Sequence, residues 1–190
     1  MQATSLSLAL SGRIVVSYLI SRYTEGHMKP FRRRTYRSPR QLLRDIRSVM
    51  RRRSDMRNLM HGDTISASFR ERLMLAVTEV NQCRYCSYYH AKQALVEGLS
   101  EDELQALTEG EFDNSPAQER PALLYAQHWA EADGSPDEEE CARITEIYVA
   151  ETANAIDLAL RVIRIGNLMG NTWDFLLYRV SLGRWGTTET

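Results

Sequence analysis

ERLMLAVTEVNQCRYCSYYH, residues 71–90, is the stretch on which both the fold and the chemistry of this chain depend. It holds a CxxC pair, Cys83 and Cys86, which is preceded by Glu71 and followed by His90. On a helix, positions 83, 86 and 90 lie within about 60° of one another, because each residue turns the helix by about 100°. We therefore expect the two sulfurs and the imidazole to share one face and one pocket.

A dithiol beside an imidazole can carry out redox chemistry. Only the thiolate is nucleophilic, and a neighbouring imidazole can accept the thiol proton. The CxxC pair lies in the first turn of a predicted helix, where the free amides favour the anion and lower the thiol pKa. A thiolate that attacks a peroxide becomes a sulfenic acid, which a second thiol condenses to a disulfide. The CxxC spacing lets two sulfurs close that bond with little backbone movement.

Half of a zinc site is the alternative interpretation of a CxxC pair. A structural zinc site usually has four ligands, and no second paired spacing exists among Cys141, His27, His61 and His128. We therefore rank redox chemistry above metal binding and predict neither a metal nor a cofactor. His27 and His61 are interpreted as exposed loop histidines, and His128 as a core or interface histidine. Cys141 is interpreted as a small buried apolar residue.

The pattern E-x11-C-x-x-C-x3-H resembles the AhpD-like alkylhydroperoxidase branch of the carboxymuconolactone decarboxylase family. The flanks RERLMLAVTEVNQC and HAKQALVEGLSEDELQAL agree, and the resemblance covers about residues 60 to 182. It implies an all-α, AhpD-like helical bundle. It also implies a homo-oligomer, with a trimer or a multiple of it as the expected state.

The resemblance further implies roles for the residues of the motif. Cys86 would attack the peroxide, Cys83 would resolve the sulfenic acid, and His90 and Glu71 would relay protons. Tyr85 stands where the best-known members have a histidine, and we keep it as a candidate site residue. A phenol with a pKa near ~10 nevertheless relays protons poorly at neutral pH. Decarboxylases of the superfamily lack the cysteine pair, which argues against that activity here. The expected function is thiol-dependent reduction of hydroperoxides, recycled by an external thiol reductant.

Glu71 also has a structural interpretation and a rival. It lies on a predicted helix over residues 66–81 that is apolar nearly all round and is therefore expected to be mostly buried. A buried carboxylate needs a partner, so a salt bridge to Arg72 or Arg120 is the alternative to a proton relay. Glu79 is nearer to the cysteines in sequence but about 80° round the helix from Glu71, and we rank it second, as a site-edge or structural residue.

Periodicity and capping signals predict only helices. We expect a candidate amphipathic helix within residues 1–24, followed by helices over 38–57, 66–81, 83–97, 100–108 and 115–132, a helix that starts at residues 135–138 and carries Cys141, and a last helix or helix pair over 151–182. Gly166 and Gly170 in the last helix allow a close helix crossing. GNTWDFLLYRV resembles the segment with which family members close the pocket, which implies hydrogen bonds near the site from Asn154, Asn167 and Asn171.

Charge is distributed unevenly along the chain. Residues 1–62 hold 14 Lys and Arg against 3 Asp and Glu, whereas residues 63–190 hold 10 against 22. We therefore divide the chain into a basic N-terminal extension, 1–62, with one or two helices, and an AhpD-like helical domain, 63–190. One face of the helix over 38–57 is predicted to carry Arg40, Arg44, Arg47 and Arg51. We interpret it as solvated or docked on the acidic remainder of the oligomer, ahead of a membrane surface and of a nucleic acid.

Three cysteines suit a reducing cytosol, and we expect a cytoplasmic protein. The N-terminus has no cationic region before an apolar run, so it does not match a standard signal peptide. Residues 14–20 are too short to span a bilayer, and charges interrupt residues 153–180. A second hypothesis, from a different class, is a non-catalytic redox-sensing or scaffold protein whose basic arm docks on a membrane or another macromolecule.

Overall fold

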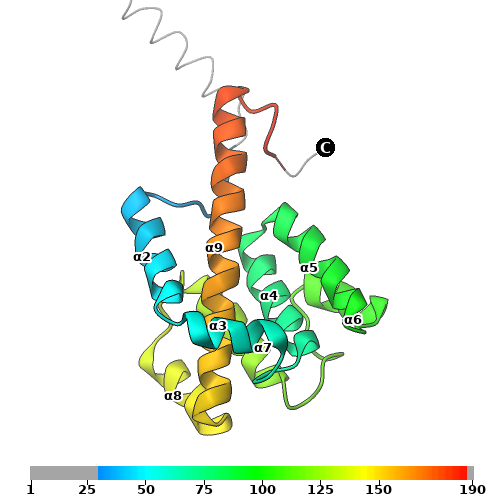
Figure 1. Cartoon of the computed structure of the whole chain (residues 1–190). Coiled ribbons are helices and arrows are strands. Elements are labelled where there is room, and N and C mark those ends of the chain that lie inside the picture. Colours follow the sequence, from blue (N-terminus) through cyan, green and yellow to red (C-terminus); the bar gives the residue numbers. More distant parts are fainter. Residues whose placement is uncertain (1–29, 188–190) are drawn as a thin grey trace, which may run out of the picture. The chain divides into compact units, whose positions relative to one another are not determined.

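All regular structure in the computed structural model, which describes residues 30–187, is helical. This confirms the predicted all-α class, whereas the helix predicted within residues 1–24 lies outside the described residues. The elements, shown in Figure 1, are α2 (Pro39–Met50), α3 (Arg53–His61), α4 (Ala67–Asn81), α5 (Arg84–Val96), α6 (Glu101–Thr108), α7 (Arg120–Glu131), α8 (Glu138–Ile147) and α9 (Ala150–Val180).

The chain divides into two compact units. Residues 33–173 form the first, which holds α2 to α8 and the greater part of α9. The second comprises, within the described residues, 30–32 and 174–187. In the second unit the ring centroids of Phe31 and Phe175 are 5.4 Å apart, edge to face. The boundary predicted near residue 62 lies inside the first unit and stays a prediction.

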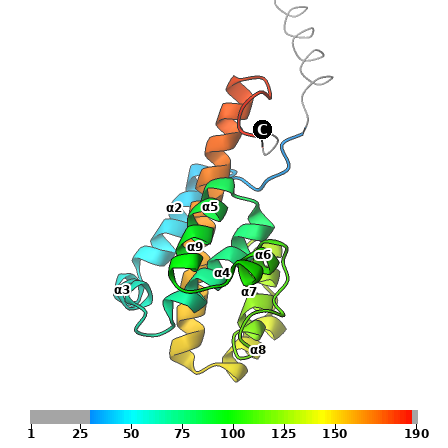
Figure 2. The same ribbon diagram turned by 90° about the vertical axis from the view of Figure 1, so that its right-hand side faces the viewer.

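The first unit is assembled around α4, which packs against α3, α5, α6 and α7. Figure 2 shows α5 and α6 on the near side of α4. Ser66 starts the helix by accepting the N–H of Phe69 at 3.1 Å. Leu73 and Val77 are fully buried, as the nearly continuous apolar character of the helix predicts. Gln82 ends α4 in the left-handed region, with φ 52°, and turns the chain directly into α5.

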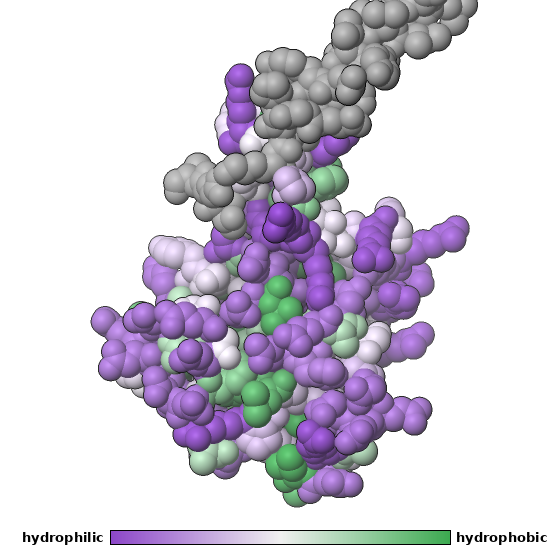
Figure 3. Space-filling view, turned by 180° about the vertical axis from the view of Figure 1, so that it is seen from behind, coloured by the Kyte–Doolittle hydropathy of each residue, from purple (hydrophilic) through white to green (hydrophobic). Residues whose placement is uncertain are grey.

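A single helix of 31 residues, α9, supplies much of the remaining core. Ile156, Leu160 and Ile163 are buried and join the core cluster that includes Trp129 of α7. The predicted helix over 151–182 is therefore one continuous element. No helix within residues 30–187 combines the length and the apolar character needed to cross a membrane. Figure 3 shows the face hidden in Figure 1, where hydrophilic side chains predominate and hydrophobic ones form small groups.

Two predicted helix boundaries are wrong because tertiary hydrogen bonds override local periodicity. The helix expected over 38–57 breaks at Arg52, whose guanidinium donates to Asp157 at 2.8 Å and to the carbonyl of Asn154 at 2.6 Å, both on α9. The helix expected from residue 115 begins at Arg120 instead. The Arg120 guanidinium bonds the Ser115 carbonyl at 2.9 Å and holds the preceding turn in place.

The positions and exposure of the isolated histidines and of the third cysteine differ in part from expectation. His61 is exposed but ends α3 rather than lying in a loop. His128 is not in the core: its side chain is 41% exposed, and Nε2 lies 3.5 Å from Asp137. Cys141 is exposed on α8, so its predicted burial is wrong. His27 lies outside the described residues.

Candidate active site

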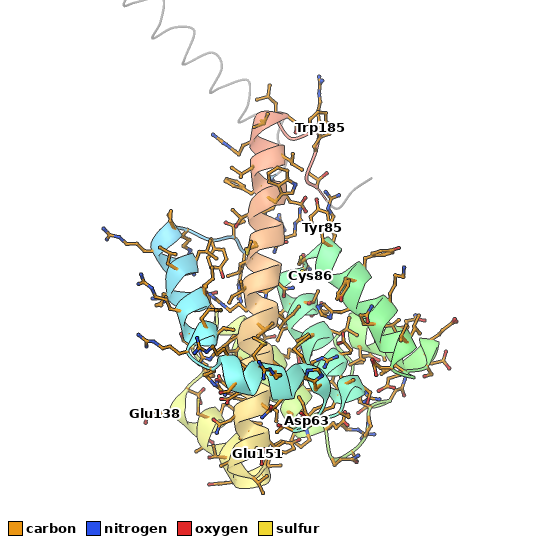
Figure 4. All side chains as sticks on the ribbon, in the orientation of Figure 1. Asp63, Tyr85, Cys86, Glu138, Glu151 and Trp185 are labelled. Atoms are coloured by element: carbon orange, nitrogen blue, oxygen red, sulfur yellow. The ribbon has the colours of Figure 1, made fainter. Side chains whose placement is uncertain are left out.

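The sharp turn between α4 and α5 places the two cysteines at the start of a helix. Cys83 is the N-cap of α5, and its sulfur accepts the backbone N–H of Cys86 at 3.4 Å. Cys83 is fully buried, Cys86 is half-buried, and neither forms a disulfide. Figure 4 shows Cys86 and Tyr85 together in the first turn of α5. The predicted placement of the dithiol at a helix start is therefore observed.

Two glycines of α9 make room for the sulfurs. A Cβ atom at Gly170 would lie only 2.8 Å from the sulfur of Cys83, which is closer than real contacts allow. A Cβ atom at Gly166 would lie 3.9 Å from the sulfur of Cys86, an ordinary contact distance. The close crossing predicted for this glycine pair is thus found, and at Gly170 the missing side chain is what leaves space for the buried thiol.

The pKa of Cys86 departs from the expectation. The hydrogen bond with Cys83 and then burial raise the pKa of the Cys86 thiol well above its usual range, although the Asn167 side chain acts in the opposite direction. The expected lowering of the thiol pKa by the helix start is therefore wrong for Cys86. A proton held between two adjacent sulfurs stabilises the neutral thiol more than the helix amides stabilise its anion. Cys86 consequently needs a base before it can attack.

The side chains of His90 and Glu71 contact one another, as the resemblance implies. Nδ1 of His90 lies 2.7 Å from Oε2 of Glu71, and both side chains are almost fully buried. The other carboxylate oxygen accepts a hydrogen bond from Nε of Arg70 at 3.2 Å. Arg70 in turn donates to the carbonyls of Leu59 and Met60 at 3.1 and 3.0 Å. The carboxylate is therefore held between a guanidinium and an imidazole.

The salt-bridge partners proposed for Glu71 from the sequence are both wrong. Arg72 bonds Glu103 at 2.6 Å and Glu119 at 3.1 Å. Arg120 bonds backbone carbonyls instead. Sequence reasoning missed Arg70, the residue immediately before Glu71, although the run of three charges in an otherwise apolar helix was the available signal.

A pocket of about 440 Å³ connects these groups. Its walls come from α3, α4, α5 and α9, and most of the lining is apolar. The lining residues are Met60, Arg70, Glu71, Met74, Tyr85, Cys86, Tyr89, His90, Gln93, Val162, Ile163 and Gly166. Cys86 thus faces the same space as the His90–Glu71 pair, whereas Cys83 lies behind it.

The two remaining candidates occupy different places. Tyr85 lines the pocket, is 44% exposed, and accepts a hydrogen bond from Arg84 at 2.9 Å. Glu79 is absent from the pocket wall and adjoins Gly110 on another side of α4. Burial and then the charge of Glu131 raise the pKa of Glu79. The structure therefore brings Tyr85 to the site and leaves Glu79 apart.

A buried polar network lies beside the dithiol. The Asn167 amide donates to Thr78 at 3.1 Å and accepts from Asn81 at 3.2 Å. Asn171 donates to the carbonyls of Asn81 at 2.7 Å and Arg34 at 3.0 Å, and its own carbonyl oxygen has no hydrogen-bond partner among residues 30–187. The expectation for these two asparagines agrees with this placement. Asn154 is instead exposed and lines a different cavity beside Arg52.

The described residues were also compared with the ligand arrangement of a metal site. Within residues 30–187 no group of three or more His, Cys, Asp and Glu side chains converges as a metal site would require. The groups around Cys86 are instead a second thiol, an imidazole and a carboxylate. Such a set can move protons and exchange a dithiol for a disulfide.

Comparison with known proteins identifies the same region of the chain. Residues 47–132 match the sequence profile of the carboxymuconolactone decarboxylase family. No curated protein and no solved structure matches the chain. The matched region contains the cysteine pair, the histidine and the carboxylate in the order that the motif requires. Residues 47–132 are therefore similar to the carboxymuconolactone decarboxylase family over the part of the chain that holds the site.

Proposed function

We propose that this protein is a thiol-dependent peroxidase that reduces hydroperoxides through a disulfide between Cys83 and Cys86. The observation that carries the proposal is the 2.7 Å contact between His90 and Glu71 in the pocket that Cys86 also lines. A paired base beside an accessible thiol meets the first requirement of nucleophilic sulfur chemistry. A second thiol behind the first meets the requirement for a resolving group.

The first step is removal of the Cys86 proton. Because the pKa of Cys86 is raised by Cys83 and by burial, the thiol is protonated at neutral pH. Glu71 beside Nδ1 favours the tautomer that carries its proton on that nitrogen, which leaves Nε2 free to accept another. His90 would take the proton as the thiolate attacks, and Glu71 would stabilise the imidazolium that results.

The second step is cleavage of the peroxide bond. The Cys86 thiolate attacks the terminal oxygen of ROOH, an S–O bond forms, and the O–O bond breaks heterolytically. The leaving alkoxide takes the proton from His90 and departs as ROH, which leaves Cys86 as a sulfenic acid. The Cys83 sulfur then attacks the Cys86 sulfur, and water leaves as the disulfide forms. One dithiol reductant restores both thiols, so each cycle consumes one hydroperoxide and one external dithiol.

Stopped-flow mixing of the reduced protein with a hydroperoxide tests the proposal. Cys86→Ser is expected to abolish peroxide consumption. Cys83→Ser is expected to stop after one turnover and to leave a sulfenic acid that a dimedone probe traps. Cys141→Ser is the matched control, because this thiol is exposed on α8 and should leave turnover unchanged. Full turnover in Cys86→Ser would overturn the assignment.

A non-catalytic redox sensor is the second candidate. The raised pKa of Cys86 and the complete burial of Cys83 favour slow oxidation, which suits a sensor better than a fast peroxidase. The two candidates differ in rate when a dithiol is supplied: a peroxidase consumes peroxide much faster than the dithiol alone does, whereas a slowly oxidised sensor adds little to that background consumption. The same stopped-flow experiment with excess reductant separates them.

We also propose that the protein is a homo-oligomer, a trimer or a multiple of it. Exposed apolar side chains on α5 support this, since Tyr88 is 69% and Val96 77% exposed in the single chain. Burying such side chains between copies would be favourable. Light scattering of the purified protein measures the mass directly, and a monomer at micromolar concentration would overturn this part of the proposal.

A further inference from the structure

The outward side of α2 carries an array of exposed arginines. We define the arginine face as Arg40, Arg44, Arg47 and Arg51, all of which are exposed. Within the described part of the chain, the only ion pair of this face is a 3.8 Å contact between Arg44 and its neighbour Asp45. The Arg44 side chain is still 75% exposed in that contact. Four guanidinium groups along one helix are therefore available to an external partner.

Two apolar side chains adjoin the arginine face. Leu43 is 48% exposed and Met50 is 60% exposed. At about 100° per residue, these two positions and the four arginines fall within an arc of about 120° on the helix. Exposure of leucine and methionine side chains to water is energetically unfavourable. The arc therefore combines positive charge with apolar surface that has no partner among the described residues.

Contacts on the opposite side of α2 keep this arc exposed. Val49, on the opposite side of α2, is buried at 8% exposure. Asp45 accepts a hydrogen bond from the hydroxyl of Tyr36 at 3.3 Å and forms an ion pair with Arg164 of α9. These contacts hold the inner side of α2 against the remainder of the first unit. The arginine face therefore belongs to a helix that is folded and packed without an external partner.

We propose that the arginine face binds the surface of a membrane that contains anionic phospholipids. Guanidinium groups bind phosphate oxygens in pairs of hydrogen bonds, and a row of them is attracted to an anionic lipid surface. Leu43 and Met50 would enter the boundary between headgroups and acyl chains, which is how interfacial helices add apolar binding to charge. A nucleic acid would use the charge but not these apolar side chains, and the arc offers no aromatic ring on which a base could stack.

Co-sedimentation of the full-length protein with vesicles tests this proposal. Phosphatidylcholine vesicles with phosphatidylserine are expected to bind the protein, and vesicles of phosphatidylcholine alone are not. Binding should weaken severalfold when salt is raised from about 0.1 M to about 1 M, because the Debye length falls from about 10 Å to about 3 Å. Arg40→Gln, Arg47→Gln and Arg51→Gln combined should lower the affinity at least tenfold. Leu43→Ser and Met50→Ser combined should lower it severalfold at either salt concentration.

A matched control separates the position of the charges from their number. Arg143→Gln, Arg179→Gln and Arg184→Gln combined also remove three positive charges, but from exposed sites outside the arginine face. This variant should leave vesicle binding unchanged. Cys86→Ser should also bind as the parent does, so a failed peroxidase assay and a failed vesicle assay are distinguishable. Equal loss in both arginine triples would overturn the proposal, as would binding to duplex DNA but not to vesicles. Unchanged binding after loss of Arg40, Arg47 and Arg51 would overturn it too.

Discussion

The carboxylate of Glu71 lies between an imidazole and a guanidinium, with Oε2 2.7 Å from Nδ1 of His90 and Oε1 3.2 Å from Nε of Arg70. A carboxylate so placed cannot rotate without losing a hydrogen bond that burial makes costly. The imidazole ring is consequently fixed in orientation and in tautomer. If His90 is the base of the site, its competence depends on Glu71 as much as on its own position.

Glu71→Gln is expected to lower peroxidase turnover by about 10²-fold or more, because the amide keeps the shape of the carboxylate but cannot stabilise an imidazolium. The expected fall lies in kcat, since the substitution does not change the pocket volume. Steady-state peroxide consumption with a dithiol reductant measures it.

Glu79→Gln is the control, on the same helix but outside the pocket wall. It should retain turnover within about twofold, the range expected of a residue that takes no part in proton transfer. Equal losses in the two variants would mean that the His90–Glu71 pair is structural. A loss in Glu79→Gln alone would transfer the relay to that carboxylate.

Gly170→Ala should perturb the dithiol, because the added methyl group would lie 2.8 Å from the sulfur of Cys83. Forcing a methyl group into packed space costs about 1–3 kcal/mol of unfolding free energy. The displaced sulfur should also close the disulfide more slowly, so the Cys86 sulfenic acid should persist longer. Chemical denaturation and dimedone trapping measure the two effects. Gly166→Ala, with 3.9 Å of clearance, is the internal comparison, and equal behaviour of the two would contradict this account.

Asn167→Ala should raise the pKa of Cys86 further, because the Asn167 side chain opposes the rise that Cys83 and burial produce. The pH midpoint of Cys86 alkylation, followed by peptide mass mapping, should move upward. Asn171→Ala removes an equally buried asparagine one turn further along α9 and provides the control. If both variants moved the midpoint alike, the effect would reflect loosened packing rather than a contact with Cys86.

The fold was accessible from the sequence where capping and periodicity act locally. Ser66 and Ser100 start α4 and α6 by accepting N–H groups of their own first turns, and Gly98 follows α5 with φ 90°. The break at Arg52 was not accessible, because it depends on Asp157, more than a hundred residues away. Long-range hydrogen bonds leave no periodic trace in the sequence, so helix ends that they determine cannot be predicted from it.

The candidate site divides in the same way. The spacing of Cys86 and His90 predicts their shared pocket, because two positions on one helix have a fixed angle between them. The expectation that both sulfurs line this pocket is wrong, because Cys83 is the extended N-cap of α5 and lies behind Cys86, outside the pocket lining. The pairing of Glu71 with His90 came from resemblance and not from spacing, since the two lie on different helices. The raised pKa of Cys86 could not be predicted, because it depends on a hydrogen bond with Cys83 and on burial that only the folded chain defines.

A last prediction concerns the buried cluster of Arg72, Glu103 and Glu119, which joins α4 to α6 and to the residue before α7. It holds two carboxylates against one guanidinium. Arg72→Met should lower the unfolding free energy by about 3–5 kcal/mol, because it leaves two buried carboxylates without their cation. Glu119→Gln should change it by only about 1 kcal/mol, because the lost charge-assisted bond is offset by removing the unbalanced charge. Urea denaturation at neutral pH measures both.

Burial raises the pKa of Glu119 more than Arg72 lowers it, so the folded chain takes up this proton at a higher pH than the unfolded chain does. Between those two pKa values the folded state binds more protons, and stability gains from this group as the pH falls through the folded pKa toward the unfolded one. Glu119→Gln removes the titration, so its unfolding free energy should gain less than that of the parent protein as the pH is lowered from 7 toward 5. Parallel pH profiles for the two proteins would show that Glu119 is not the titrating group.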